Sequence, residues 1–213
     1  MKKVILSLAV IASILVSCKG EKKDKVEVKE EVMVVDTAAT NNVDVSTSVI
    51  TWKGEKPTGT HNGVIMLKEG AIIMDGEMLT GGEFVIDMAS IQNKDLDAES
   101  AAKLVGHLTS ADFFDIATYP TSKFVITSVE ETEGELAVTG NLTLKNVTKS
   151  ITIPATVYTT EGVTTFESAK FFIDRADFNV KYGSKKFFDD LKDKFINDLM
   201  ELSFVVNTTA ATM

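Results

Sequence analysis

The chain has 213 residues, and 31 acidic against 22 basic side chains give it a net charge of −9 at neutral pH. This length suits one domain with a tail, and the acidity disfavours binding to the phosphate backbone of a nucleic acid. The single cysteine leaves no disulfide within the chain, so the fold must depend on a hydrophobic core.

Residues 1–17 have the features of a lipoprotein signal peptide. Lysines at positions 2 and 3 precede the apolar run Val4–Val16, which is too short to span a bilayer comfortably. The run ends in Leu15-Val16-Ser17-Cys18, which resembles the bacterial lipobox, where cleavage precedes a cysteine that receives lipid. We therefore expect acylated Cys18 to anchor the mature protein to a membrane, as a periplasm-facing or surface lipoprotein of the cell envelope. A buried N-terminal helix and an ordinary secreted chain are the alternatives.

Residues 18–43 are predicted to be a flexible tether. They are rich in charge and then in small polar residues, and they contain no aromatic side chain. The valine-rich stretch Val32–Val35 has the composition to pair transiently as a strand, although a solvated linker is the simpler interpretation. The folded domain is expected over residues 44–209.

The domain consists largely of segments in which apolar and polar residues alternate with a period of two. Such alternation places one set of side chains on each face of a β-strand. In the clearest example, Leu136, Val138 and Leu142 share one face. The predicted strands are Val49–Lys53, Gly63–Lys68, Glu83–Met88, Lys123–Val129, Glu135–Lys145, Ile151–Val157, Thr164–Ile173 and Leu202–Val206.

Two segments break this alternation and predict short helices. Asp97–Leu108 has apolar residues at three- and four-residue spacing, which is typical of an amphipathic helix. Lys185–Ile196 places Phe187, Phe188, Leu191 and Phe195 at helical spacing after Ser184, a candidate cap. About eight mostly antiparallel strands in one small domain favour a closed barrel, because closure removes exposed edges. A barrel of this size can hold one small ligand.

The chain from Ser48 to the last strand resembles the YceI-like family of bacterial envelope proteins. The stretches that carry the resemblance are Trp52–Gly54 with Gly59–Gly63, Gly82–Phe84 with Asp87–Ile91, Gly106–Asp115 with Tyr119-Pro120, Val138–Thr148 and Asp174–Ser184. One departure is Asn179, where a glycine would be expected. The resemblance implies an eight-stranded antiparallel lipocalin-like barrel, here with two short helical segments. It also implies binding of a polyisoprenoid or other amphiphilic lipid. Separately, we expect no cofactor and no enzymatic activity.

Within this resemblance we select nine candidate ligand-binding residues and neither a catalytic nor a metal-binding residue. Large aromatic side chains either line such a cavity or pack in the core, and adjacent phenylalanines of a strand point to opposite faces. The candidates are Trp52, His61, Phe84, His107, Phe113, Phe114, Phe172, Arg175 and Tyr182.

The charged candidates have alternative roles. Arg175 is the only arginine, and its guanidinium suits either a lipid headgroup or a structural ion pair with Asp174 or Asp177. His61 and His107 are the only histidines; without a cysteine partner they make a weak metal site, and structural hydrogen bonds suit them better.

Three functions are compatible with these patterns. The favoured one is an envelope lipoprotein that binds an amphiphilic lipid in transport, storage or stress response. An envelope enzyme acting on a lipid is the second, but the sequence has no Gly-x-Ser-x-Gly or His-Glu-x-x-His motif and no glycine-rich phosphate loop. The third is a structural or stress module whose barrel is filled by its own side chains. The sequence leaves a homodimer open.

Overall fold

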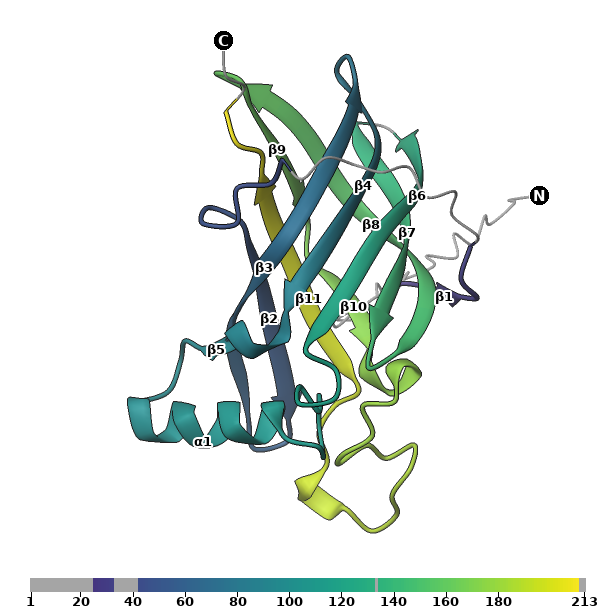
Figure 1. The fold of residues 1–213 in the computed structure, drawn as a ribbon. Helices are drawn as coiled ribbons and strands as arrows, with labels where there is room; N and C mark the ends of the chain where they lie inside the picture. Colours follow the sequence, from purple (N-terminus) through teal and green to yellow (C-terminus); the bar gives the residue numbers. More distant parts are fainter. Residues whose placement is uncertain (1–24, 33–41, 133, 211–213) are drawn as a thin grey trace, which may run out of the picture.

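The computed structural model describes residues 25–32, 42–132 and 134–210, and its strands form one antiparallel sheet rolled into a barrel (Figure 1). The expected signal peptide and Cys18 lie outside these residues. The strands are β1 (Val28–Lys29), β2 (Val49–Lys56), β3 (Gly59–Asp75), β4 (Met78–Asp87), β5 (Gln92–Asn93), β6 (Thr121–Thr132), β7 (Glu135–Leu144), β8 (Val147–Thr160), β9 (Val163–Ser168), β10 (Phe171–Asp174) and β11 (Leu199–Asn207).

The barrel is closed by β9, which pairs with β8 on one side and with β11 on the other. Beyond a break at residues 169–170, β10 continues along β11, so β9 and β10 share one position in the wall. With β2, β3, β4, β6, β7, β8 and β11 this makes eight positions. The predicted eight-stranded antiparallel barrel is therefore confirmed, although the predicted strand Thr164–Ile173 is two strands.

Inward-facing side chains fill one part of the barrel and leave the other hollow. Phe84 stacks on Phe166 with ring centroids 5.7 Å apart, and Phe204 lies 4.8 Å from Phe166. These rings belong to β4, β9 and β11 and pack in the hydrophobic core. Inward positions nearer the other end of the same strands, such as Ile86 and Leu202, line a cavity instead.

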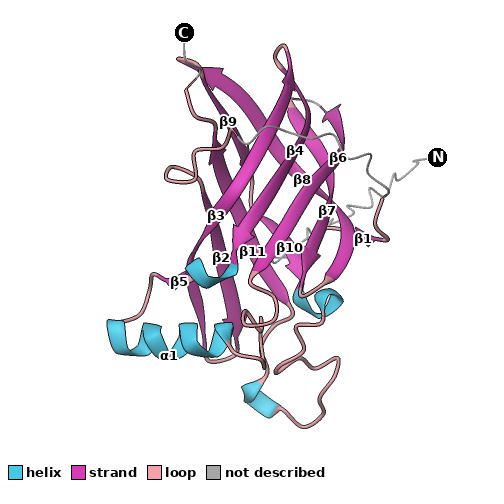
Figure 2. Ribbon diagram, in the orientation of Figure 1, coloured by secondary structure: helices cyan, strands magenta, loops and turns pink. Residues whose placement is uncertain are grey.

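One of the two predicted helices is present (Figure 2). The helix α1 (Ala98–Thr109) begins after Asp97, whose side chain accepts hydrogen bonds from the Glu99 and Ser100 amides. Three single turns of 3-10 helix accompany it: η1 (Met88–Ser90), η2 (Arg175–Phe178) and η3 (Lys192–Lys194). Among the described residues, no helix is long and apolar enough to cross a membrane.

The second predicted helix, Lys185–Ile196, is wrong. This segment is a loop of turns in which only Lys192–Lys194 is helical, as the short η3. Asp190 and Lys192 have φ values of 58° and 47°, a backbone conformation that interrupts a right-handed helix. The spacing of its apolar residues resembles that of a helix. The conformation of the segment is instead determined by contacts with the end of the barrel, which are described in the next section.

Residues 25–32, part of the expected tether, lie against the barrel wall. Val28 and Lys29 pair with Ile151 and Ser150 of β8, and the Val26 amide donates to the Phe172 carbonyl of β10 (2.9 Å). Asn141 accepts from the Val32 amide and donates to its carbonyl. This N-terminal segment therefore adds to the sheet at the seam between β8 and β10.

Candidate functional site

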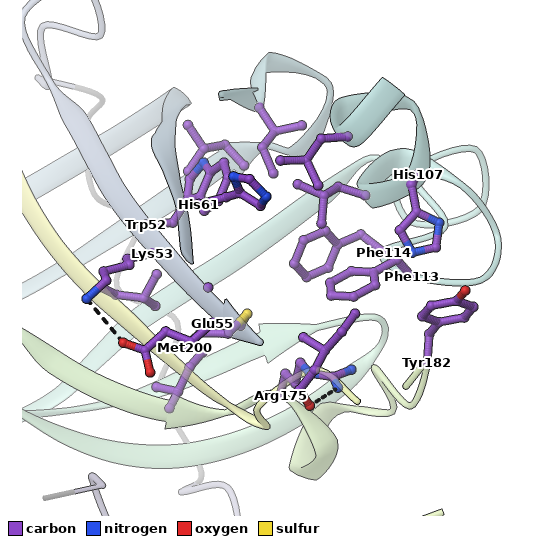
Figure 3. A pocket seen from close by; sticks show the side chains of 18 of the residues that line it. Trp52, Lys53, Glu55, His61, His107, Phe113, Phe114, Arg175, Tyr182 and Met200 are labelled. Atoms are coloured by element: carbon purple, nitrogen blue, oxygen red, sulfur yellow. Dashed lines mark hydrogen bonds and ion pairs between the residues drawn. The ribbon is translucent and has the colours of Figure 1, made fainter. Parts of the chain in front are cut away.

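A cavity of about 560 Å³ occupies the end of the barrel next to α1 and the loop of residues 181–196, named here the mouth loop (Figure 3). This volume lies within the range of small-molecule sites. Its walls are mainly apolar and come from most of the strands and from α1. The apolar lining residues are Ile50, Trp52, Ile65, Ile86, Met88, Ile91, Leu104, Leu108, Phe113, Phe114, Leu142, Leu144, Ile173, Ile196, Met200 and Leu202.

Trp52 lies in the wall where β2, β3 and β5 meet. Its indole Nε1 donates to the Val64 carbonyl oxygen at 3.3 Å, which fixes the ring within the wall. The ring lies so close to Gly63 that a Cβ atom there would stand 2.6 Å from it and 1.8 Å from the Gln92 carbonyl oxygen. A glycine at 63 is therefore required for this packing.

Aromatic side chains form the side of the cavity between α1 and the mouth loop. The His107 ring meets the Tyr182 ring edge-on with centroids 4.5 Å apart, and it lies 5.7 Å from Phe113. Phe114 is edge-on to Phe113 at 4.9 Å, and Figure 3 shows both phenylalanines beside the hollow. These contacts connect α1, the segment that follows it and the mouth loop at the cavity entrance.

Arg175 lies at the base of the mouth loop and is fully buried. Its Nη1 donates to the Val180 carbonyl (2.8 Å), its Nη2 to the Ile196 carbonyl (3.1 Å) and its Nε to the Asn197 carbonyl (3.2 Å). Asp198 is 3.2 Å from Nη2 and completes an ion pair. Burial lowers the pKa of Arg175, and the nearby carboxylates of Asp198 and Asp174 oppose this effect.

These contacts give Arg175 a structural role. Three of its donors are used by backbone carbonyls on both sides of the mouth loop, so it braces that loop. Its ion-pair partner is Asp198 and neither of the expected residues, because Asp174 pairs with Lys25 and Lys186. Asp177 instead pairs with Lys25, at 2.5 Å.

His61 stands on the polar side of the cavity and is held by Asp95. Its Nδ1 lies 2.9 Å from Asp95 Oδ2, while Asp95 Oδ1 accepts from the Asn62 amide (2.8 Å) and the Asn93 side chain (2.6 Å). Burial acts to raise the pKa of Asp95, but these hydrogen bonds outweigh it and the pKa lies below its ordinary value. An ionised Asp95 fixes His61 by Nδ1 and leaves Nε2 for another partner.

Charged and polar side chains form the rim of the mouth. Lys53 lies 3.1 Å from Glu55 and 3.9 Å from Glu201. Lys56, Thr58, Asp193 and Lys194 complete the polar part of the lining. The arrangement offers a long apolar chain an apolar interior and offers its polar end a mouth where lysines outnumber acidic side chains.

Seven of the nine candidate residues line the cavity: Trp52, His61, His107, Phe113, Phe114, Arg175 and Tyr182. Phe84 does not, because it packs with Phe166 in the filled part of the barrel. Phe172 does not either, because its neighbours Phe171 and Ile173 point inward and strand alternation turns it to the outer face.

Several residues that line the cavity or contact its lining escaped the sequence analysis. Asp95 carries no motif, and only the fold brings it to His61 from 34 residues away. Leu142, Leu104 and Met200 follow apolar patterns that mark an inward face, but a pattern cannot distinguish a cavity wall from a packed core. Lys56 and Lys194 look like ordinary surface residues in the sequence.

Comparison with known proteins gives the same fold. The model of the YceI-like domain matches residues 41–208. A UPF0312 protein of Pseudomonas putida is 53% identical over 51 residues, 24% of this chain and 27% of its own length. Protein YceI of Salmonella newport is 49% identical over 49 residues, 23% of this chain and 26% of its own length. These matches therefore span about a quarter of each relative.

Solved structures extend the likeness over most of the chain. Burkholderia cenocepacia BcnA has a TM-score of 0.65 at 23% identity, over 79% of this chain and all of that one. A polyisoprenoid binding domain from Saccharophagus degradans has a TM-score of 0.62 at 18% identity, over 80% and 98%. At these identities the likeness concerns the fold. Because the family model covers more than half of the sequence, the chain belongs to the YceI-like family.

Proposed function

We propose that this protein is a cell-envelope lipoprotein that holds a polyisoprenoid or similar amphiphilic lipid in its barrel, in transport, storage or stress response. The observation that carries the proposal is the apolar cavity at one end of a closed barrel. A structural neighbour from Saccharophagus degradans is a polyisoprenoid binding domain, which supports the same class of ligand. The proposal includes no chemical step and assigns no catalytic residue.

Burial of apolar surface supplies enough affinity for such a ligand. Each isoprene unit moved from water into the cavity contributes up to about 3–4 kcal/mol, at about 0.8 kcal/mol per carbon group. The cavity wall needs no specific chemistry for this. The polar mouth, with His61 and its partner Asp95, lies where the headgroup of an inserted lipid would remain.

The experiment compares two tryptophan substitutions on β7. Leu142 lines the cavity, whereas Leu136 lies on the same inward face, is also half-buried and is not part of the lining. We expect L142W to weaken binding of a fluorescent prenyl alcohol by about tenfold or more, equivalent to about 1.4 kcal/mol. L136W should bind like the wild type.

Native mass spectrometry of the wild-type protein purified from its own membrane gives the second readout. We expect a co-purified lipid that L142W carries in lower amount. Equal binding by L142W and L136W would place the ligand outside this cavity. A wild-type protein that repeatedly carries no lipid and takes up none of the prenyl probe would refute the proposed function.

A further inference from the structure

The mouth loop exposes aromatic side chains to solvent beside the cavity. Tyr182 is 45% exposed, Phe187 45% and Phe188 48%, and the two phenylalanines do not line the cavity. Phenylalanine rings left in water at neighbouring positions indicate a surface that another apolar phase covers.

The mouth loop is also rich in lysine. Residues 181–196 contain five lysines and three aspartates, a local excess of positive charge in a chain of net charge −9. Lys181 Nζ lies 5.0 Å from the centre of the Phe187 ring, and Lys185 Nζ lies 3.5 Å from that of Phe195. Aromatic side chains next to lysines are typical of protein segments that lie in the headgroup region of an anionic bilayer.

The mouth loop is fixed at its base, so its exposed tip has a defined position. The Ile196 amide donates to the Gly183 carbonyl (2.8 Å), and Ser184 Oγ donates to Asp198 (2.9 Å). Arg175 holds the loop from below through the Ile196 carbonyl. Because Tyr182 and Ile196 also line the cavity, the exposed surface is continuous with the cavity mouth.

The N-terminal segment reaches the same end of the barrel, which is an independent observation. Lys25 pairs with Asp174 (3.3 Å) and Asp177 (2.5 Å), and Lys186 of the mouth loop pairs with the same Asp174. Cys18 precedes Lys25 by seven residues, so an extended chain would place the two at most about 25 Å apart. An acyl anchor at Cys18 would therefore hold the mouth loop near the bilayer.

We propose that the mouth loop is a membrane-docking surface, in which Phe187 and Phe188 enter the headgroup region of an anionic bilayer while the lysines of the loop contact lipid phosphates. Docking turns the cavity mouth toward the membrane, so that a lipid passes between bilayer and barrel without crossing water. The inference rests on the proposed function, because docking aids lipid transfer only if the cavity binds lipid.

The first experiment measures which end of the barrel touches the bilayer. F188W and Y158W place a tryptophan at positions of equal exposure, 48%, one in the mouth loop and one near the far end of β8. The full chain is reconstituted with phosphatidylcholine and phosphatidylglycerol vesicles that contain spin-labelled lipid. After subtraction of the Trp52 signal of the wild type, we expect quenching and a blue shift for F188W only. Equal quenching of both variants, or quenching of neither, would overturn the proposal.

The second experiment separates docking from ligand binding. We expect F187S/F188S to take up a fluorescent prenyl lipid from vesicles about tenfold more slowly than the wild type, equivalent to about 1.4 kcal/mol of lost interfacial binding. Its affinity for farnesol added from solution should be unchanged, because neither phenylalanine lines the cavity. The control M78S/Y158S removes exposed apolar side chains at the far end and should behave like the wild type.

The outcomes distinguish the two proposals. Uptake by F187S/F188S at the wild-type rate would refute docking by this loop while leaving the lipid cavity in place. A protein whose mouth loop is quenched by the vesicle probe, but that binds neither farnesol nor the prenyl lipid, would refute the proposed function and keep the docking surface.

Discussion

At the scale of single residues, Arg175 organises the mouth of the cavity. It is a fully buried cation whose donors reach carbonyls at positions 180, 196 and 197, on both sides of the mouth loop. A guanidinium suits this task because its donors point in several directions from one plane. Its charge is balanced by Asp198, which lies two residues after the mouth loop.

We expect R175M to destabilise the protein strongly, because removal of the cation leaves Asp198 and three carbonyls without their partner. The loss should be about 3–5 kcal/mol in the free energy of unfolding, the usual cost of breaking a buried pair. Urea unfolding measures it. The control K103M removes one partner of an exposed i,i+4 pair with Glu99 and should change stability by less than about 1 kcal/mol. A stable R175M that loses only lipid affinity would instead make Arg175 a headgroup ligand.

At the scale of elements, the strands and α1 could be predicted because their burial follows a regular period. The inward face of β7 and the capped start of α1 are local properties of the sequence. The mouth loop could not be predicted in this way. Its phenylalanines have helical spacing, but its conformation depends on Arg175 and Asp198, which lie outside the loop. The strand β1 was likewise hidden, because two residues paired to β8 leave no period to detect.

The junction of β2, β3 and β5 offers a test of close packing at an element boundary. We expect G63A to destabilise the protein by about 1–3 kcal/mol, the range for overpacking, because a Cβ atom would collide with the Trp52 ring and the Gln92 carbonyl. Trp52 fluorescence should shift as the ring moves, and urea unfolding gives the stability. On the neighbouring strand, G54A is the matched control, since a Cβ atom at that position would have no neighbour within 4 Å. Equal effects of both substitutions would contradict the argument.

At the scale of the whole molecule, the barrel combines a solid core with a hollow end. The same kinds of side chain, mainly isoleucine, leucine and phenylalanine, build both parts. For this reason the sequence could not show which inward residues meet the cavity: seven of the nine candidates line it, whereas Phe84 packs in the filled part. The filled part begins where large aromatic rings from separate strands pack against one another. The sequence of one strand cannot predict such a contact between strands.

The boundary between the two parts should set how long a chain the barrel accepts. Ile86 of β4 lines the cavity. Phe84, two residues earlier on the same strand, is the next inward residue away from the mouth. We expect F84A to deepen the cavity and to raise the affinity for longer prenyl alcohols relative to farnesol, at a stability cost of about 3–5 kcal/mol. Competition binding with prenyl alcohols of increasing length measures the preference.

The control for this change is L79A, which removes a buried side chain of the same strand at the far end of the barrel. It should cost about 2–5 kcal/mol of stability without altering the chain-length preference. If F84A and L79A shift that preference equally, general loosening of the barrel explains the effect, and the loss of the Phe84 ring at the inner end of the cavity does not. If only F84A shifts it, the Phe84 ring is the physical limit of the cavity, because its removal alone joins new volume to it.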